Sequence, residues 1–198
     1  MLGLYRSRLV GMPDFVTMPD RDDIDLETGL IRRPAPRHYP SGPVSVAAVL
    51  DAGVRDHPSR PAVIDDMGVL TYLELDQEVH RVAAAIQAGT RPAEVLAWCL
   101  PNSADLVVGF LATLRVGRVW LGVNPRLPGD ARADLVRRSG AQIVVDVGFK
   151  WPVAKESTPY LANEPIDPHA PAVMSPTSGT TGQPKLVVHS QHGLLWPG

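Results

Sequence analysis

Near its C-terminal end the chain reads Ser175-Pro-Thr-Ser-Gly-Thr-Thr-Gly-Gln-Pro-Lys185, and the apolar run Leu186-Val-Val188 follows directly. Glycine permits positive φ angles and lets the main chain approach a ligand closely. Successive amide groups in such a turn form a concave anion site. The hydroxyls of Thr177, Ser178, Thr180 and Thr181 add donors, and Lys185 adds a point charge suited to phosphate. The stretch therefore predicts a phosphate-binding loop.

The surrounding sequence agrees with an anionic ligand. From Pro168 to Gly198 there is no Asp or Glu, and Lys185 is the only formally charged side chain. The loop is not a Walker A motif, because Gln183 and Pro184 separate Gly182 from the lysine. The β-branched pair after the lysine also favours a strand over the helix of that motif. A solvent-exposed turn without a ligand remains the alternative that these residues leave open.

Composition limits the other classes of function. The 198 residues carry a net charge of −2, so electrostatics gives no support for a nucleic-acid partner or an anionic membrane. A single cysteine, Cys99, excludes an internal disulfide and a multi-cysteine zinc site. The best membrane candidate is the apolar run 106–114, far shorter than the roughly 20 residues that a spanning helix needs. We therefore expect no transmembrane segment and a cytoplasmic location.

The order of predicted elements indicates an α/β fold. Residues 1–44 form a Pro-rich leader without a sustained helix or strand period, and the pattern changes at about residue 45. Thr71 and Glu74 form a capping box, Asn102 is placed to cap the next helix, and Gly140 to end the following one. We expect helices over 46–54, 71–89, 102–117 and 128–139, strands over 61–64, 69–71, 94–100, 119–123, 142–147 and 172–174, a turn at 65–68, and a connection over 150–171. This alternation predicts a parallel-rich sheet with crossover helices.

Thr177-Ser-Gly-Thr-Thr-Gly-Gln-Pro-Lys185 resembles the AMP-binding signature of the adenylate-forming superfamily, which includes acyl-CoA synthetases, nonribosomal peptide adenylation domains and luciferases. Two upstream segments resemble family motifs in the expected order, Leu70-Thr-Tyr-Leu-Glu-Leu75 and Leu114-Arg-Val-Gly-Arg-Val-Trp-Leu-Gly-Val-Asn-Pro125. Leu186 departs from the glycine of many members, and leucine there is frequent in aryl-acid-activating ones. The resemblance covers about residues 44–198.

The resemblance implies the N-terminal part of the enzyme's large domain. Residues 45–198 would then be an incomplete AMP-binding domain that ends after the phosphate loop. The residues it assigns to the β- and γ-phosphates of ATP are Thr177, Ser178, Gly179, Thr180, Thr181, Gly182 and Lys185. The complete family enzyme uses ATP and Mg²⁺ to form an acyl-adenylate from a carboxylic acid, and a thiol, usually that of coenzyme A or of a phosphopantetheine arm, then takes the acyl group.

Three interpretations of the function follow. The first is the N-terminal fragment of an ATP-dependent carboxylate–CoA ligase. The second is an aryl- or amino-acid adenylating protein that loads a carrier protein. The third is a non-catalytic product of a truncated or split gene, whose partner would be a separate C-terminal half. Because the family's later motifs lie downstream, we assign no catalytic residue and expect the chain alone to be inactive in adenylation.

The remaining reactive side chains favour structural roles. His189 and His192 have a metal-like spacing but no third ligand nearby in the sequence, so we assign no metal site. Cys99 lies in an apolar strand without a neighbouring charge, which is typical of a core thiol. Phe110 and Trp120 are expected in the core. Four arginines are expected on a solvated face, with a coenzyme or partner surface as the alternative: Arg126, Arg132, Arg137 and Arg138.

Overall fold

The structure is a computed structural model that describes residues 46–151, 166–177 and 185–195. The predicted leader over residues 1–44 and most of the predicted phosphate loop lie outside the described residues. Every structural statement below concerns the described ranges.

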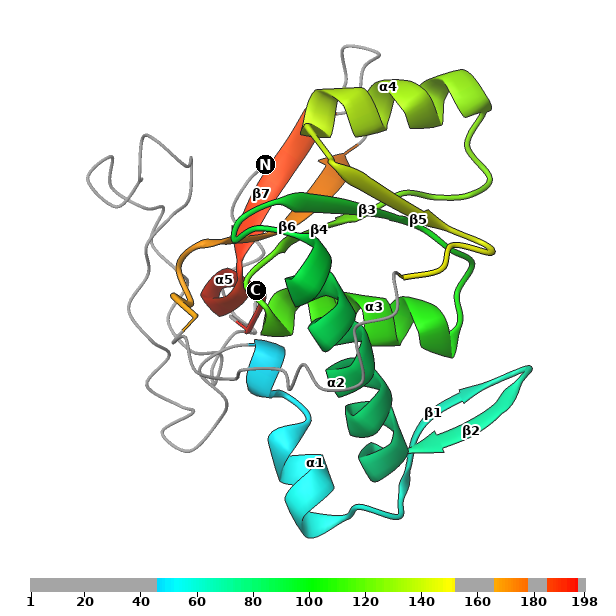
Figure 1. The fold of residues 1–198 in the computed structure, drawn as a ribbon, viewed down its shortest axis with the longest axis vertical. Coiled ribbons are helices and arrows are strands. Elements are labelled where there is room, and N and C mark those ends of the chain that lie inside the picture. Colours follow the sequence, from blue (N-terminus) through cyan, green and yellow to red (C-terminus); the bar gives the residue numbers. More distant parts are fainter. Residues whose placement is uncertain (1–45, 152–165, 178–184, 196–198) are drawn as a thin grey trace, which may run out of the picture.

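A five-stranded sheet forms the centre of the fold, with strand order β5-β3-β4-β6-β7 (Figure 1). The strands are β3 (Val95–Cys99), β4 (Val119–Gly122), β5 (Ile143–Asp146), β6 (Pro171–Thr177) and β7 (Lys185–Ser190). The pairs β5–β3, β3–β4 and β4–β6 are parallel, and only β7 runs antiparallel to its neighbour β6. The predicted α/β fold with a parallel-rich sheet is confirmed.

Helices cover both faces of this sheet. Leu96 and Trp98 of β3 belong to the same apolar cluster as α2 (Tyr72–Gly89) and α3 (Ala104–Arg115). The alternate residues of β3 belong to a second cluster with α4 (Gly129–Ser139). Successive strand side chains point to opposite faces. The two helix layers therefore lie on opposite sides, as Figure 1 shows with α4 above the sheet and α2 and α3 below it.

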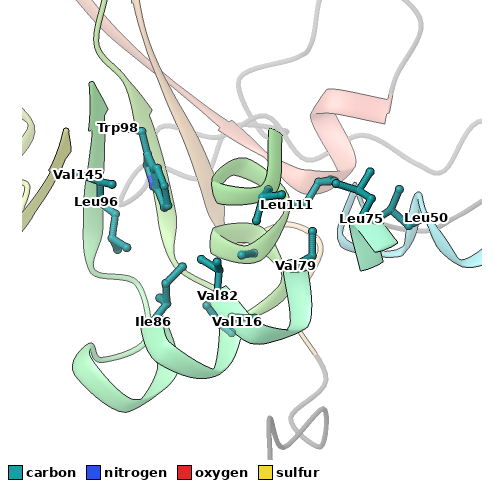
Figure 2. Close-up of a cluster of buried hydrophobic side chains, with 13 residues drawn as sticks. Leu50, Leu75, Val79, Val82, Ile86, Leu96, Trp98, Leu111, Val116 and Val145 are labelled. Atoms are coloured by element: carbon teal, nitrogen blue, oxygen red, sulfur yellow. The ribbon is translucent and has the colours of Figure 1, made fainter. Parts of the chain in front are cut away.

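The larger core lies between β3, α2 and α3. Figure 2 shows the apolar stripe of α2 directed toward the side chains of β3 and α3. Members of this stripe are Leu75, Val79, Val82 and Ile86, and none is more than 6% exposed. Their spacing of three or four residues places them on one face of the helix. The helix predicted over 71–89 is confirmed, and its capping box between Thr71 and Glu74 is present.

The N-terminal elements differ from the prediction at one point. The helix expected over 46–54 is wrong as a single element, since the chain forms a 3₁₀ turn, η2 (Val46–Ala48), and a separate helix, α1 (Asp51–Asp56). The amide of Val49 bonds to the carbonyl of Val46, and the turn places Leu50 in the core at 6% exposure. Val49 and Leu50 form a turn between the two pieces. The hairpin β1 (Pro61–Asp65) and β2 (Gly68–Thr71) agrees with the prediction.

A second helix start is also corrected. Ser103, not Asn102, is the N-cap of α3, since its Oγ accepts from the amide of Leu106. Ser103 has the extended backbone of an N-cap, with φ −158° and ψ 167°. The predicted end of α4 is confirmed, because Gly140 adopts a left-handed conformation with φ 68°.

The apolar run 106–114 lies within α3, which has 12 residues. Several of its side chains, including Val108 and Leu111, pack into the core. Across residues 46–151, 166–177 and 185–195, no helix combines the length and the apolar character needed to cross a membrane.

Candidate phosphate-binding site

Two paired strands hold the ends of the predicted phosphate loop next to each other. β6 and β7 form an antiparallel pair whose last register position joins Thr177 to Lys185. The Thr177 hydroxyl donates to the carbonyl oxygen of Lys185 at 3.3 Å, and both residues are exposed. Residues 178–184 connect these two positions. The other predicted phosphate contacts lie in this connection, outside the described residues: Ser178, Gly179, Thr180, Thr181 and Gly182.

The base of this hairpin is anchored in the sheet and the core. β6 pairs with β4 through Val173 and Met174, and Val173 is 4% exposed. Met174 and Leu186 pack against the cluster beneath α4. The strand predicted over 172–174 therefore continues further than expected, to Thr177. Beyond Met174, β6 pairs only with β7. The part of the hairpin that leads into the loop, from Ser175 to Thr177 and its partners on β7, therefore has no pairing with β4.

A buried glutamine fixes the other end of β7. Gln191 begins α5 (Gln191–Leu195), is 2% exposed, and donates from Nε2 to the carbonyl oxygen of Leu114 at 2.9 Å. This bond ties the exit of the hairpin to the C-terminal end of α3. Gln191 was not predicted as a residue of the site. No local signal could reveal it, since its partner lies 77 residues away.

The described surroundings of Lys185 contain no carboxylate partner for its ammonium group. The ion pairs of the described residues lie on α1, on α2 and α3, and on α4, for example between Arg137 or Arg138 and Asp134. A lysine without a competing acid remains available to an anion. This observation agrees with the acid-free sequence on both sides of the loop.

The histidines near the loop form no described metal site. His189 sits in the β6–β7 ladder opposite Val173. The ring of His192 lies 4.6 Å from that of His169, centroid to centroid, and burial together with the nearby His169 lowers the pKa of His192. No group of three or more His, Cys, Asp or Glu able to hold a metal occurs among the described residues.

Cys99 has a charged neighbour that the sequence did not predict. The thiol is buried at the end of β3, as expected, but the Nη1 atom of Arg132 lies 3.6 Å from its sulfur. The expectation of a site without a nearby charge is wrong, because α4 crosses the sheet and brings Arg132 over the strand end. The helix thus turns this arginine inward, away from the solvated face predicted for it.

A family model for AMP-binding enzymes matches residues 50–197. The chain belongs to the AMP-binding enzyme family. The match includes the hairpin, the phosphate-loop segment and the sheet described above. It confirms the family that the signature and the two upstream segments indicated.

Curated relatives within the AMP-binding family include peptide synthetases. The chain is 32% identical to phosphinothricin tripeptide synthetase PhsC of Streptomyces viridochromogenes over 179 residues, 80% of this chain and 16% of the relative. It is 33% identical to surfactin synthase subunit 3 of Bacillus subtilis over 151 residues, 67% of this chain and 12% of the relative. The chain therefore spans only a small part of these proteins.

Solved structures of AMP-binding relatives share the fold. The N-terminal subdomain of Klebsiella oxytoca NpsA in complex with anthranilyl-AMSN superimposes with a TM-score of 0.64 at 26% identity, over 74% of this chain and 41% of that one. O-succinylbenzoate coenzyme A synthetase (MenE) of Bacillus subtilis, in complex with AMP, gives a TM-score of 0.57 at 24% identity, over 71% and 41%. The fold is thus that of part of an adenylate-forming N-terminal subdomain.

Proposed function

We propose that this chain supplies the phosphate-binding part of an ATP-dependent adenylate-forming enzyme. The observation that carries the proposal is the pairing of Thr177 with Lys185, which brings together the two ends of a Gly- and hydroxyl-rich connection. A connection held at both ends by a sheet can present its amides as a fixed anion site. Lys185 then adds a cation at the mouth of that site.

The residues act on the leaving group of the proposed reaction. A carboxylate oxygen attacks the α-phosphorus of ATP, an acyl-adenylate forms, and pyrophosphate leaves with the bonding electron pair. Lys185 and the Thr177 hydroxyl, together with the predicted contacts over 178–182, hold the β- and γ-phosphates and stabilise the charge that develops on pyrophosphate. Mg²⁺, when bound, would neutralise phosphate charge.

The acyl acceptor distinguishes two versions of this function. In the first, coenzyme A takes the acyl group, as in a carboxylate–CoA ligase; the fold shared with the MenE synthetase supports it. In the second, a carrier protein takes an amino acid or aryl acid, which the identity to two peptide synthetases favours. Both versions use the same phosphate loop.

A binding measurement on the 198-residue chain tests the phosphate site. Inorganic pyrophosphate is titrated into the chain by isothermal calorimetry, and Lys185→Gln is expected to weaken binding by about tenfold. Lys150→Gln is the matched control, since Lys150 is also exposed and lies outside the hairpin. Because Lys185 is exposed, its substitution leaves the thermal melt unchanged.

Equal affinity of the native chain and Lys185→Gln for pyrophosphate would contradict the proposal. A second assay measures the exchange of pyrophosphate into ATP in the presence of a carboxylic acid. It tests the separate expectation that the chain alone is inactive in adenylation. Exchange by the native chain would refute that expectation while leaving the phosphate site intact.

A further inference from the structure

The chain connections change direction between two neighbouring strands. After β3 the chain crosses to β4 through α3, on one face of the sheet. After β4 it crosses to β5, on the far side of β3, through α4 on the opposite face. The segments that leave the carboxyl ends of β3 and β4 therefore diverge. In open α/β sheets, such a switch point opens a crevice in which ligands bind.

A cavity of about 540 Å³ occupies this position. Its rim consists of residues that directly follow the two strands: Leu100, Pro101, Asn102, Asn124, Pro125 and Arg126. The volume lies within the roughly 300–1,000 Å³ of small-molecule sites. The predicted phosphate loop follows β6, and none of the described cavity residues belongs to β6 or β7.

Tryptophan rings provide an apolar wall. Trp98 and Trp120 both line the cavity. The benzo ring of Trp120 fills the space beside Gly122, where a Cβ atom would overlap it. Phe110 packs edge-to-face against Trp120, with centroids 5.2 Å apart, and holds the ring in this orientation. Trp120, expected in the core, packs against it and is half-buried, with one side lining the cavity.

The positive charge at the cavity favours an anionic ligand. Among the described residues that line the cavity, Arg126 is the only charged one, and none carries a carboxylate. Its backbone amide donates to Asn124 Oδ1, and its exposed guanidinium makes no hydrogen bond or ion pair with the described residues. A planar guanidinium binds a carboxylate through two parallel hydrogen bonds.

We propose that the cavity between the ends of β3 and β4 binds a planar aromatic monocarboxylate. The aromatic ring packs against Trp120, and the carboxylate pairs with Arg126. Arg126 is one cation, and no glycine-rich loop lies beside it among the described lining residues. This charge matches a ligand with one negative charge better than the phosphate chain of a nucleotide. The proposal concerns binding alone and does not rest on the phosphate-site function.

NMR of the ¹⁵N-labelled full chain with 2-naphthoate tests this site. The four tryptophans give separate indole N–H signals, and Trp151 lies outside the cavity lining. We expect saturable shifts that are largest for the Trp120 signal, and a smaller shift for Trp151, whose ring lies 6.0 Å from that of Trp98. The neutral 2-naphthamide and the non-planar cyclohexanecarboxylate are expected to bind at least about tenfold more weakly.

Variants separate the site from unspecific attraction. Arg126→Gln is expected to weaken 2-naphthoate about tenfold, whereas Arg60→Gln, another exposed arginine outside the lining, leaves the affinity unchanged. Trp120→Leu removes the flat wall and weakens the ligand as well. The proposal would be overturned if Arg126→Gln bound 2-naphthoate as tightly as the native chain, or if 2-naphthamide bound as tightly as 2-naphthoate. Tighter binding of AMP at Trp120, or shifts confined to Trp151, would also overturn it.

Discussion

Asp65 accepts a hydrogen bond from the backbone amide of Ala104, 39 residues later in the chain, at 2.9 Å. Its other carboxylate oxygen accepts from the amides of Met67 and Gly68, at 2.8 and 3.2 Å. A single side chain therefore closes the β1–β2 turn and satisfies an amide at the start of α3. The sequence predicted only the first of these roles.

These bonds make the Asp65 contribution dependent on pH. The amides of Ala104, Met67 and Gly68 hold the pKa of the Asp65 carboxyl below its ordinary value. A lowered pKa stabilises the fold above the ordinary range of about pH 4, and this stabilisation is lost as the pH falls below it. Asp65→Ala should therefore lower the urea midpoint more at pH 7 than at pH 3.

Asp66→Ala is the control for this comparison, because Asp66 is its exposed neighbour in the same turn. It should leave the midpoint unchanged at both pH values. A loss of equal size for Asp65→Ala at pH 7 and pH 3 would show that the carboxylate charge has no part in the effect.

Gly109 leaves room for the indole of Trp98 in the core. A Cβ atom at this position would overlap the six-membered ring of Trp98, which is 3% exposed. Gly109→Ala should destabilise the fold by about 1–3 kcal/mol through overpacking, despite the higher helix propensity of alanine. Gly89→Ala meets no atom within 4 Å and should be neutral or slightly stabilising. Denaturant melts that gave both variants the same stability would exclude the steric explanation.

The pair Asp76–Arg115 joins α2 to α3. Arg115 is 8% exposed, and its Nη1 atom lies 2.8 Å from Asp76 Oδ1. Asp76→Ala withdraws a carboxylate from a buried cation and should cost about 3 kcal/mol in the free energy of unfolding. The double variant Asp76→Leu/Arg115→Met should recover much of this loss, because two apolar side chains avoid the desolvation of charge. A double variant less stable than Asp76→Ala would argue against this account.

Gln191 connects the exit of β7 to α3. Gln191→Leu removes the donor to the Leu114 carbonyl and should destabilise the chain by about 1–3 kcal/mol. The exposed Gln77 of α2 provides the control, since Gln77→Leu changes no described hydrogen bond. Chemical denaturation compares the two. Equal denaturation midpoints for Gln191→Leu and Gln77→Leu would mean that water replaces the Gln191 amide without a loss of stability.

Local signals in the sequence predicted most elements of the fold. The Thr71–Glu74 capping box and the terminal Gly140 act within one helical turn, so their patterns are visible without any tertiary contact. The boundary at Ser103 was missed by one residue, since Asn102 is an equally suitable cap and only the packing of α3 decides between them. The split at Val49–Leu50 was missed because the helical spacing of the apolar residues continues through it.

Features that depend on distant contacts could not be predicted. The composition of the loop indicated a phosphate site, but the pairing of Thr177 with Lys185 depends on the length of β6 beyond Met174. The approach of Arg132 to Cys99 depends on where α4 crosses the sheet. The cavity beside Trp120 depends on the order of the strands, which the alternation of elements does not encode.

The antiparallel edge of the sheet has a consequence for folding. β6 and β7 are neighbours in sequence, and the pair next to their connection is Thr177 with Lys185. β6 pairs with β4 at Trp120–Val173 and Leu121–Met174, across a long intervening chain. Closing a short loop costs less entropy and is faster than closing a long one. We expect the β6–β7 hairpin to form early as a local unit and to dock onto β4 afterwards. The folding chain would thus form the two strands that flank its predicted phosphate loop before its sheet is complete.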